Sequence, residues 1–262
     1  MKTPQPYYIT ICLFQCRFIS HIVTGIHCHL VRLGFLKIPV CIREAPGGLY
    51  KNLQKIWFAR LLKKLVSLWV RSPLRRDAFG LVNFDFQIPG STGLILVTCH
   101  TPWKRLLVQW FFENHYALII DTGKSKQRQS RLKVQRKGHN EIAHIIRHLR
   151  FGGQVIIAAD VFNKSADQPA EILGKPGNLS LLPARLARIA GVPLMAAVPQ
   201  VRNGVIHIYP GPRYDAQIPH AEMGTVMQNL LGFFENEIKK DPSIWSYFVN
   251  DPLSLYHKKR IE

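Results

Sequence analysis

The chain has 262 residues, of which 47% are hydrophobic, and this length suits one large α/β domain or two small ones. Its 35 lysines and arginines outnumber 16 aspartates and glutamates, so we expect an anionic partner: nucleic acid, a lipid surface or an acidic carrier protein. The five cysteines form no C-x-x-C pair, which argues against the common zinc and redox motifs and predicts reduced structural thiols.

Residues 1–76 are almost purely basic and apolar, and we interpret them as an N-terminal membrane-associating helical segment. Residues 8–36 are hydrophobic, but Arg17, His21 and Arg32 are among the polar side chains that interrupt them. No uninterrupted run reaches the roughly 20 residues that span a bilayer. A membrane-associated or packed helix is therefore expected here rather than a true span.

A second helix is predicted over residues 51–71, where apolar residues recur at helical spacing and lysines and arginines supply the polar side. A basic amphipathic helix that contains Trp57 and Trp69 and no acidic residue is typical of an interfacial helix on anionic lipid. The alternative is a surface helix whose apolar face meets the core. Both interpretations can hold together.

Residues 77–262 alternate apolar runs with helical patterns, which predicts an α/β domain with a mostly parallel central sheet flanked by helices on both faces. Ligands bind at the carboxyl ends of the strands in such sheets, so His100, Asp121 and Asp160 are candidate site residues. Strands are predicted at 81–88, 94–99, 116–120, 154–159, 194–201 and 205–209, the last two as a hairpin, and helices at 102–114, 139–150, 180–190 and 221–240.

His100 lies at a predicted strand-to-helix turn. The apolar run Leu94–Cys99 stops at His100, Thr101 can cap the following helix, and Pro102 suits the first helical position. The positive end of the helix dipole favours the neutral imidazole that a general base needs. A capping or core histidine is the alternative interpretation.

The common nucleotide-binding, hydrolase and zinc-protease motifs are missing from the sequence. Glu141, His144 and His148 share one face of the predicted helix 139–150, and we interpret them as a solvated helix face rather than a metal site. Neither a metal nor a cofactor is expected. Nucleic-acid binding is disfavoured because no recognition motif or aromatic-basic strand face is visible.

Several segments together resemble the lysophospholipid acyltransferase superfamily, nearest its lipid A (lauroyl/myristoyl) acyltransferase branch. The resemblance covers roughly residues 80–210. It is carried by the strand that ends in His100, the helix and basic loop after it, and then Gly153-Gln-Val-Ile-Ile-Ala-Ala-Asp160, Ile172-Leu-Gly-Lys-Pro-Gly-Asn-Leu-Ser180, Pro183-Ala-Arg-Leu-Ala187 and Gly191-Val-Pro193.

The resemblance implies transfer of a fatty acyl group from acyl carrier protein or acyl-CoA to a hydroxyl of a lipid or glycolipid acceptor. His100 matches the family's catalytic base. The family has Asp or Glu five positions after this His, whereas this chain has Arg105. The resemblance and the local charge indicate six candidate substrate-binding residues: Lys104, Arg105, Gly174, Lys175, Asn178 and Arg185. Residues 174–178 are expected to form a glycine-rich loop.

Arg105 leaves three alternatives open for this site. Asp160 or Asp121 can orient His100 in place of the family acid, or the helix N-terminus can suffice with a reactive thioester donor. Otherwise the protein is a non-catalytic relative that binds membrane or carrier. Our prediction is an acyltransferase with His100 and Asp160 as its catalytic pair. It is expected on the cytoplasmic face of the cell inner membrane as a peripheral or monotopic protein, with an anionic lipid surface as partner and the basic loop 124–137 as the binding site for an acidic acyl carrier protein.

Overall fold

The fold is described from a computed structural model. It describes residues 7–32, 46–69, 82–87, 92–104, 106–107, 110–111, 117–120, 134–135, 139–160, 167–173, 175–203 and 205–246.

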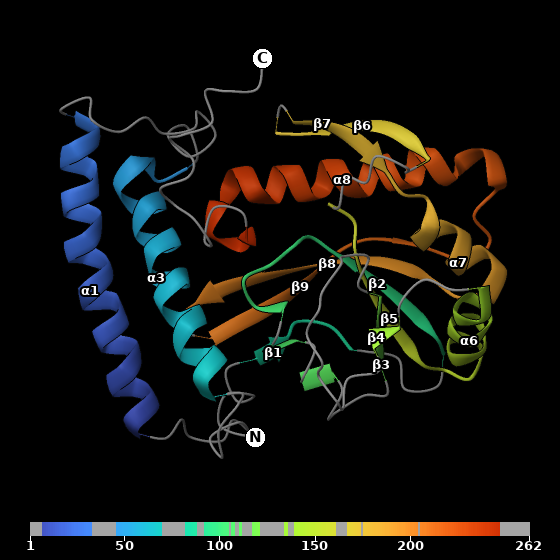
Figure 1. The fold of residues 1–262 in the computed structure, drawn as a ribbon, viewed down its shortest axis with the longest axis horizontal. Coiled ribbons are helices and arrows are strands. Elements are labelled where there is room, and N and C mark those ends of the chain that lie inside the picture. Colours follow the sequence, from blue (N-terminus) through green and yellow to red (C-terminus); the bar gives the residue numbers. More distant parts are fainter. Residues whose placement is uncertain are drawn as a thin grey trace.

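Within these ranges, seven strands form one sheet in the order β1-β9-β8-β2-β5-β3-β4 (Figure 1). Every neighbouring pair runs parallel except β8 and β9, which are antiparallel. The prediction of an α/β fold with a mostly parallel sheet flanked by helices is confirmed. The strands are β1 (Val82–Phe84), β2 (Leu94–Thr98), β3 (Ala117–Ile120), β4 (Val134–Gln135), β5 (Gln154–Ala158), β8 (Leu194–Arg202) and β9 (Val205–Tyr214).

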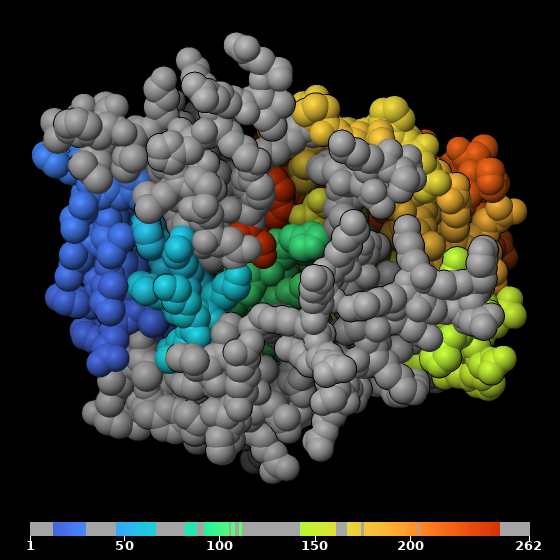
Figure 2. All heavy atoms as spheres, viewed as in Figure 1, coloured from blue at the N-terminus to red at the C-terminus, as the bar shows by residue number. Residues whose placement is uncertain are grey.

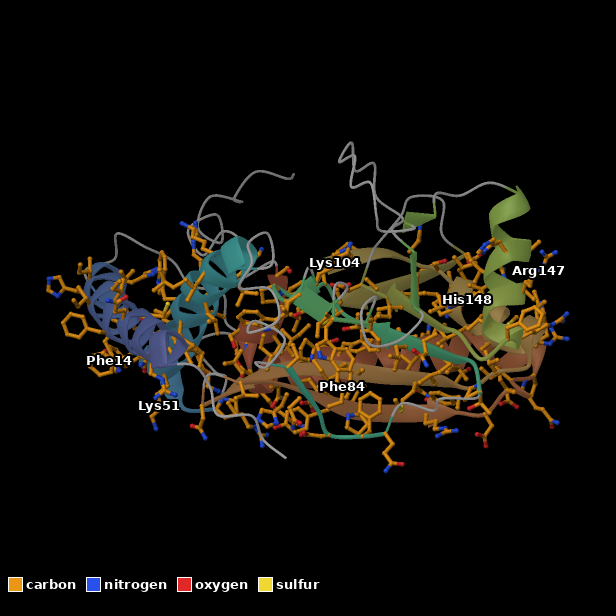
Figure 3. The ribbon with its side chains drawn as sticks, turned by 90° about the horizontal axis from the view of Figure 1, so that it is seen from below. Phe14, Lys51, Phe84, Lys104, Arg147 and His148 are labelled. Carbon is orange, nitrogen blue, oxygen red and sulfur yellow. The ribbon has the colours of Figure 1, made fainter. Side chains whose placement is uncertain are left out.

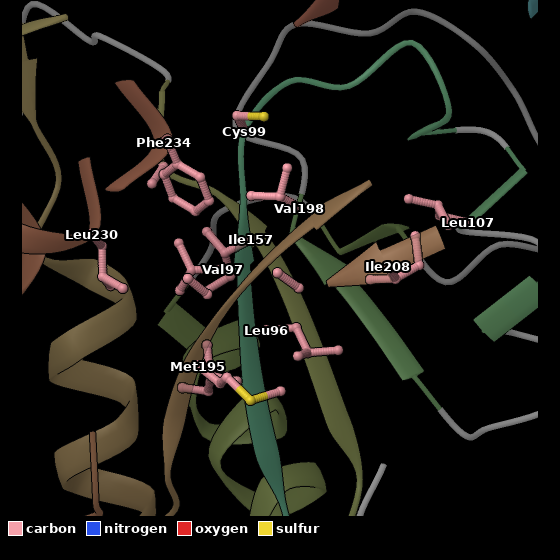
Figure 4. Packing of buried hydrophobic residues seen from close by; sticks show 14 of the residues in the cluster. Leu96, Val97, Cys99, Leu107, Ile157, Met195, Val198, Ile208, Leu230 and Phe234 are labelled. Carbon is pink, nitrogen blue, oxygen red and sulfur yellow. The ribbon is translucent and has the colours of Figure 1, made fainter. Parts of the chain in front are cut away.

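The centre of the sheet is covered on both faces. Figure 4 shows Leu230 and Phe234 on one side of β2 and Leu107 on the other. The first four residues of β2 are buried, as expected for a parallel strand between two layers. The helices α6 (His139–Arg150), α7 (Leu182–Ala190) and α8 (Met223–Lys240) pack on one another in sequence and against the strands.

The predicted hairpin between residues 194–201 and 205–209 is confirmed. Strands β8 and β9 pair antiparallel from Arg202↔Val205 to Leu194↔Tyr214, with an irregularity between Met195 and Ala197. Strand β9 extends to Tyr214, beyond the predicted end. Of the described part of the first predicted strand, 81–88, only Val82–Phe84 form a strand, and residues 85–87 do not.

Residues 175–178 of the segment expected as a glycine-rich loop form part of a strand instead, so the prediction of a loop is wrong for them. Strands β6 (Gln168–Ile172) and β7 (Lys175–Leu179) make a separate antiparallel pair, with Pro169 opposite Asn178. The chain reverses after Leu173, which has a positive φ of 51°. Figure 1 shows this pair beside α8.

The two N-terminal helices, α1 (Tyr7–Arg32) and α3 (Gly48–Trp69), lie side by side at one end of the sheet (Figure 1). The apolar face of α3 is buried and belongs to the same core as the sheet, through Leu53, Ile56, Ala59, Leu62 and Val66. Of the two interpretations of residues 51–71, the structure has the helix whose apolar face meets the core.

Candidate functional site

The site is built where two neighbouring parallel strands end. Thr98 of β2 lies opposite Ala158 of β5, and Ala159 continues the ladder by donating its N–H to the Thr98 carbonyl oxygen at 2.9 Å. His100 and Asp160 each come two residues after the end of their strand. Two parallel strands in this register therefore bring the two side chains to the same edge of the sheet.

His100 and Asp160 form a hydrogen-bonded pair. The Nδ1 atom of His100 lies 2.7 Å from Oδ1 of Asp160, and the His100 backbone N–H donates to the same oxygen at 2.8 Å. An ionised carboxylate can only accept, so Nδ1 is the donor in this contact, and in the neutral ring this arrangement leaves the lone pair on Nε2. This is the arrangement of a general base held by an acid.

The two side chains differ sharply in exposure. The Asp160 side chain is 2% exposed, whereas that of His100 is 38% exposed. The carboxylate is thus shielded from water while the imidazole can reach a substrate. In Figure 2 green atoms, the colour of the described residues between 82 and 111, are visible at the surface beside the cyan atoms of α3.

The second oxygen of Asp160 is held by Trp245. The indole Nε1–H donates to Asp160 Oδ2 at 2.6 Å, and Trp245 is 5% exposed. A buried carboxylate is stable only when its oxygens are hydrogen-bonded, and both oxygens here have donors. Sequence reasoning missed Trp245, because a single tryptophan 85 residues from Asp160 carries no spacing signal.

The residues around His100 fix its backbone. Thr101 Oγ1 accepts the Trp103 N–H at 3.2 Å, which is the capping contact that the sequence predicted. On the other side of the turn, Ser246 donates its N–H to the His100 carbonyl oxygen at 2.6 Å. Residues 104, 106, 107, 110 and 111 are helical, within the predicted helix 102–114.

Cys99, immediately before His100, is a buried thiol at the end of β2 (Figure 4). Burial raises the pKa of the Cys99 thiol well above its usual value, and the negative charge of Asp160 raises it further. The thiol therefore stays protonated and is a structural group rather than a nucleophile.

The predicted substrate-binding residues are spread over several elements. Lys104 is helical and directly follows the turn after His100, and its N–H donates to the Thr101 carbonyl oxygen at 3.2 Å. Asn178 is half-buried on β7. Arg185 on α7 makes an ion pair with Asp167 at 2.8 Å, and the same carboxylate accepts the Leu181 N–H, so this arginine braces the approach to α7.

Some predicted site residues lie outside the described residues. These are Arg105, Asp121, Gly174, the side chain of Lys175 and, apart from strand β4, the basic loop 124–137.

We predicted that the face of helix 139–150 with His144 and His148 is solvated, and this prediction is wrong for His148. His148 is buried, and its Nε2 lies 3.0 Å from the carbonyl oxygen of Gln154, so the ring ties α6 to β5. The Glu141 side chain is outside the described part. Across the described ranges, no group of three or more His, Cys, Asp or Glu side chains is placed to hold a metal ion.

An apolar stripe runs along the outer side of α1. Four residues follow one another at intervals of four and are 51–70% exposed: Phe14, Phe18, Ile22 and Ile26. We call these four the outer stripe. Ile19 on the same helix is 45% exposed. Figure 3 shows Phe14 projecting away from the rest of the molecule. No helix in the described part of the chain has both the length and the apolarity to cross a membrane.

Neither a protein-family model nor a curated protein matches the sequence. Among solved structures, the chain is similar to the crystal structure of the 1-acyl-sn-glycerophosphate (LPA) acyltransferase PlsC from Thermotoga maritima. The likeness has 14% sequence identity and a TM-score of 0.38, and it covers 85% of this chain and 97% of that one. A likeness at this level assigns neither a family nor an activity.

Proposed function

We propose that the chain is an acyltransferase that moves a fatty acyl group from a thioester, carried by acyl carrier protein or coenzyme A, to a hydroxyl of a lipid-like acceptor. The observation that carries this proposal is the 2.7 Å contact between His100 Nδ1 and a carboxylate buried at the end of β5. Combined with the resemblance of residues 153–201, a base of this kind favours the enzyme over the non-catalytic alternative.

In the proposed reaction, His100 Nε2 removes the proton of the acceptor hydroxyl, and the oxygen attacks the thioester carbonyl carbon. Asp160 stabilises the imidazolium that forms and keeps the ring oriented. The C–O bond is made and the C–S bond breaks, after which the leaving thiolate takes the proton from the imidazolium. Lys104 and Arg105 are proposed to bind an anionic phosphate of either substrate, and the 174–178 segment to line the acyl site.

The proposal places this reaction at a membrane surface, specifically the cytoplasmic face of the inner membrane. It is supported by the outer stripe of α1, whose phenylalanine and isoleucine side chains are exposed on one helix face. It is also supported by the net charge of +19, which favours an anionic lipid surface or an acidic acyl carrier protein.

The decisive experiment compares the wild-type protein with His100→Ala. Acyl transfer is measured with labelled acyl-CoA and acyl-loaded carrier protein as donors, and lysophospholipids and lipid A precursors as acceptors. The rate should fall by about 10²- to 10⁴-fold, the range that a general base contributes. Thermal unfolding should change little because the His100 side chain is 38% exposed.

The matched control is His220→Ala, since His220 is an exposed histidine in the turn before α8. This variant should keep the wild-type rate. Equal transfer by wild type and His100→Ala would contradict the proposed mechanism, whereas lipid or carrier binding without any transfer would support the non-catalytic alternative.

A further inference from the structure

Trp245 reaches the site from the far end of the described chain. It follows the short helix η2 (Pro242–Ile244), which comes directly after α8. Its indole N–H contacts the Asp160 oxygen that does not face His100. The carboxylate is therefore held from both sides, by the loop after β2 and by the segment after α8.

The segment that carries Trp245 is itself firmly held. Asp241 caps η2 by accepting the Ser243 N–H at 3.1 Å and the Ser243 hydroxyl at 2.7 Å. Pro242, Ser243 and Ile244 are buried, and η2 packs against α3, α8 and β8. The 2.6 Å bond from the Ser246 N–H to the His100 carbonyl oxygen then ties the same segment to the histidine.

We infer that Trp245 is a positioning residue for the proposed acyl transfer, an inference that rests on the proposed function. The plane of a carboxylate can turn about its last torsion, which has broad minima. A donor fixed on Oδ2 prevents this rotation and keeps Oδ1 facing His100 Nδ1. It also stabilises the negative charge of a carboxylate that is almost fully removed from water.

A packing role and a hydrogen-bonding role for Trp245 make different predictions. Trp245→Phe leaves an aromatic ring in the buried site but removes the N–H. A site-specific replacement by 3-benzothienylalanine keeps the bicyclic shape and exchanges the N–H for sulfur. If packing alone matters, the second variant behaves as wild type. If the hydrogen bond matters, both variants lose the orientation of Asp160.

The first readout needs no substrate. A proton held between His100 Nδ1 and a carboxylate gives a far-downfield proton NMR resonance, which is assigned by its loss in His100→Ala. This resonance should weaken or vanish in both Trp245 variants of the full chain. It should persist in Trp110→Phe, the matched control, because Trp110 packs against the rings of Phe84 and Phe111.

The second readout is the steady-state rate with acyl-CoA as donor. Both Trp245 variants should lower kcat by about 10- to 100-fold at unchanged KM, the loss expected for one hydrogen bond to a charged group. An unchanged resonance and an unchanged kcat in the benzothienyl variant would overturn the inference. If the resonance depends on Trp245 but wild type transfers no acyl group, the proposed function fails while the positioning role stands.

Discussion

Asp160 is the residue at which three parts of the chain meet. It accepts from the His100 ring, the His100 backbone and the Trp245 indole. The sequence narrows the partner of His100 to Asp121 or Asp160, because both follow apolar strands. Strand order decides between them: β5, which precedes Asp160, is the neighbour of β2, and β3 lies on the far side of β5.

Asp160→Asn should reduce acyl transfer by about 10⁴-fold, as expected when a His–Asp pair loses the charge that sets the imidazole tautomer. The amide nitrogen can also face the indole or imidazole N–H, so a loss of about 1–3 kcal/mol in the free energy of unfolding is expected. Transfer rates and chemical denaturation measure the two effects. Asp215→Asn, a change of an exposed carboxylate, is the control, and a rate close to wild type in Asp160→Asn would contradict the role of the pair.

The contact of Trp245 with Asp160 could not be predicted from the sequence. Its neighbours, Asp241-Pro-Ser-Ile, predict a turn, but nothing in their spacing indicates which residue the indole meets. That contact depends on the direction in which α8 leads the chain back across the sheet, a tertiary property that local patterns do not contain.

At the scale of elements, the predicted helix 139–150 coincides with α6, and the predictions 180–190 and 221–240 differ from α7 and α8 only by two residues at their starts. Helix α3 spans Gly48–Trp69 against a prediction of 51–71. The spacing of apolar residues in α3 identifies the apolar face of the helix but not what packs against that face. In the structure the face packs into the same core as the sheet. Strand β6 was missed because Pro169 interrupts its pattern, and a proline within an apparent strand argues against a central strand; here it lies in a two-stranded pair, in which each strand has an edge.

The contact between α1 and α3 should weaken in mild acid. Trp57 donates its indole N–H to His27 Nδ1 at 3.0 Å, which requires a neutral imidazole, and burial lowers the pKa of His27 below its usual value of 6.5. The unfolded state then binds the proton more readily. The contribution of His27 to stability is present above about pH 6.5 and is lost as the pH falls towards its lower folded-state pKa.

Thermal unfolding of wild type and of His27→Phe between pH 8 and pH 5 isolates this effect from the other histidines. The melting temperature of the wild type should fall more over this range than that of the variant. Parallel pH curves for the two proteins would show that His27 does not control the contact.

At the scale of the whole molecule, the proposed binding to a membrane has two separable contributions, one from the outer stripe and one from the positive charge. Phe14→Ser/Phe18→Ser should weaken partition onto anionic vesicles by about 10²-fold or more, because each buried phenylalanine contributes about 1.5–3 kcal/mol. Vesicle flotation measures this loss. Phe151→Ser is a matched control, since Phe151 is 86% exposed after α6, outside α1.

Raising the salt concentration should weaken the binding of wild type and of the double variant by the same factor, because screening acts on the charge and not on the stripe. Equal partition of wild type and the double variant at every salt concentration would instead show that α1 does not contact the lipid.

His100, Asp160 and Trp245 are separated along the chain by 60 and 85 residues. During synthesis the base therefore remains incomplete until the ribosome has passed Ser246 and α8 has folded back across the sheet. The outer stripe of α1, by contrast, precedes all three of these residues in the chain. Under the proposed function, the segment that meets the lipid surface is therefore synthesised before the residues that complete the base, and the order of translation puts membrane contact before acyl transfer.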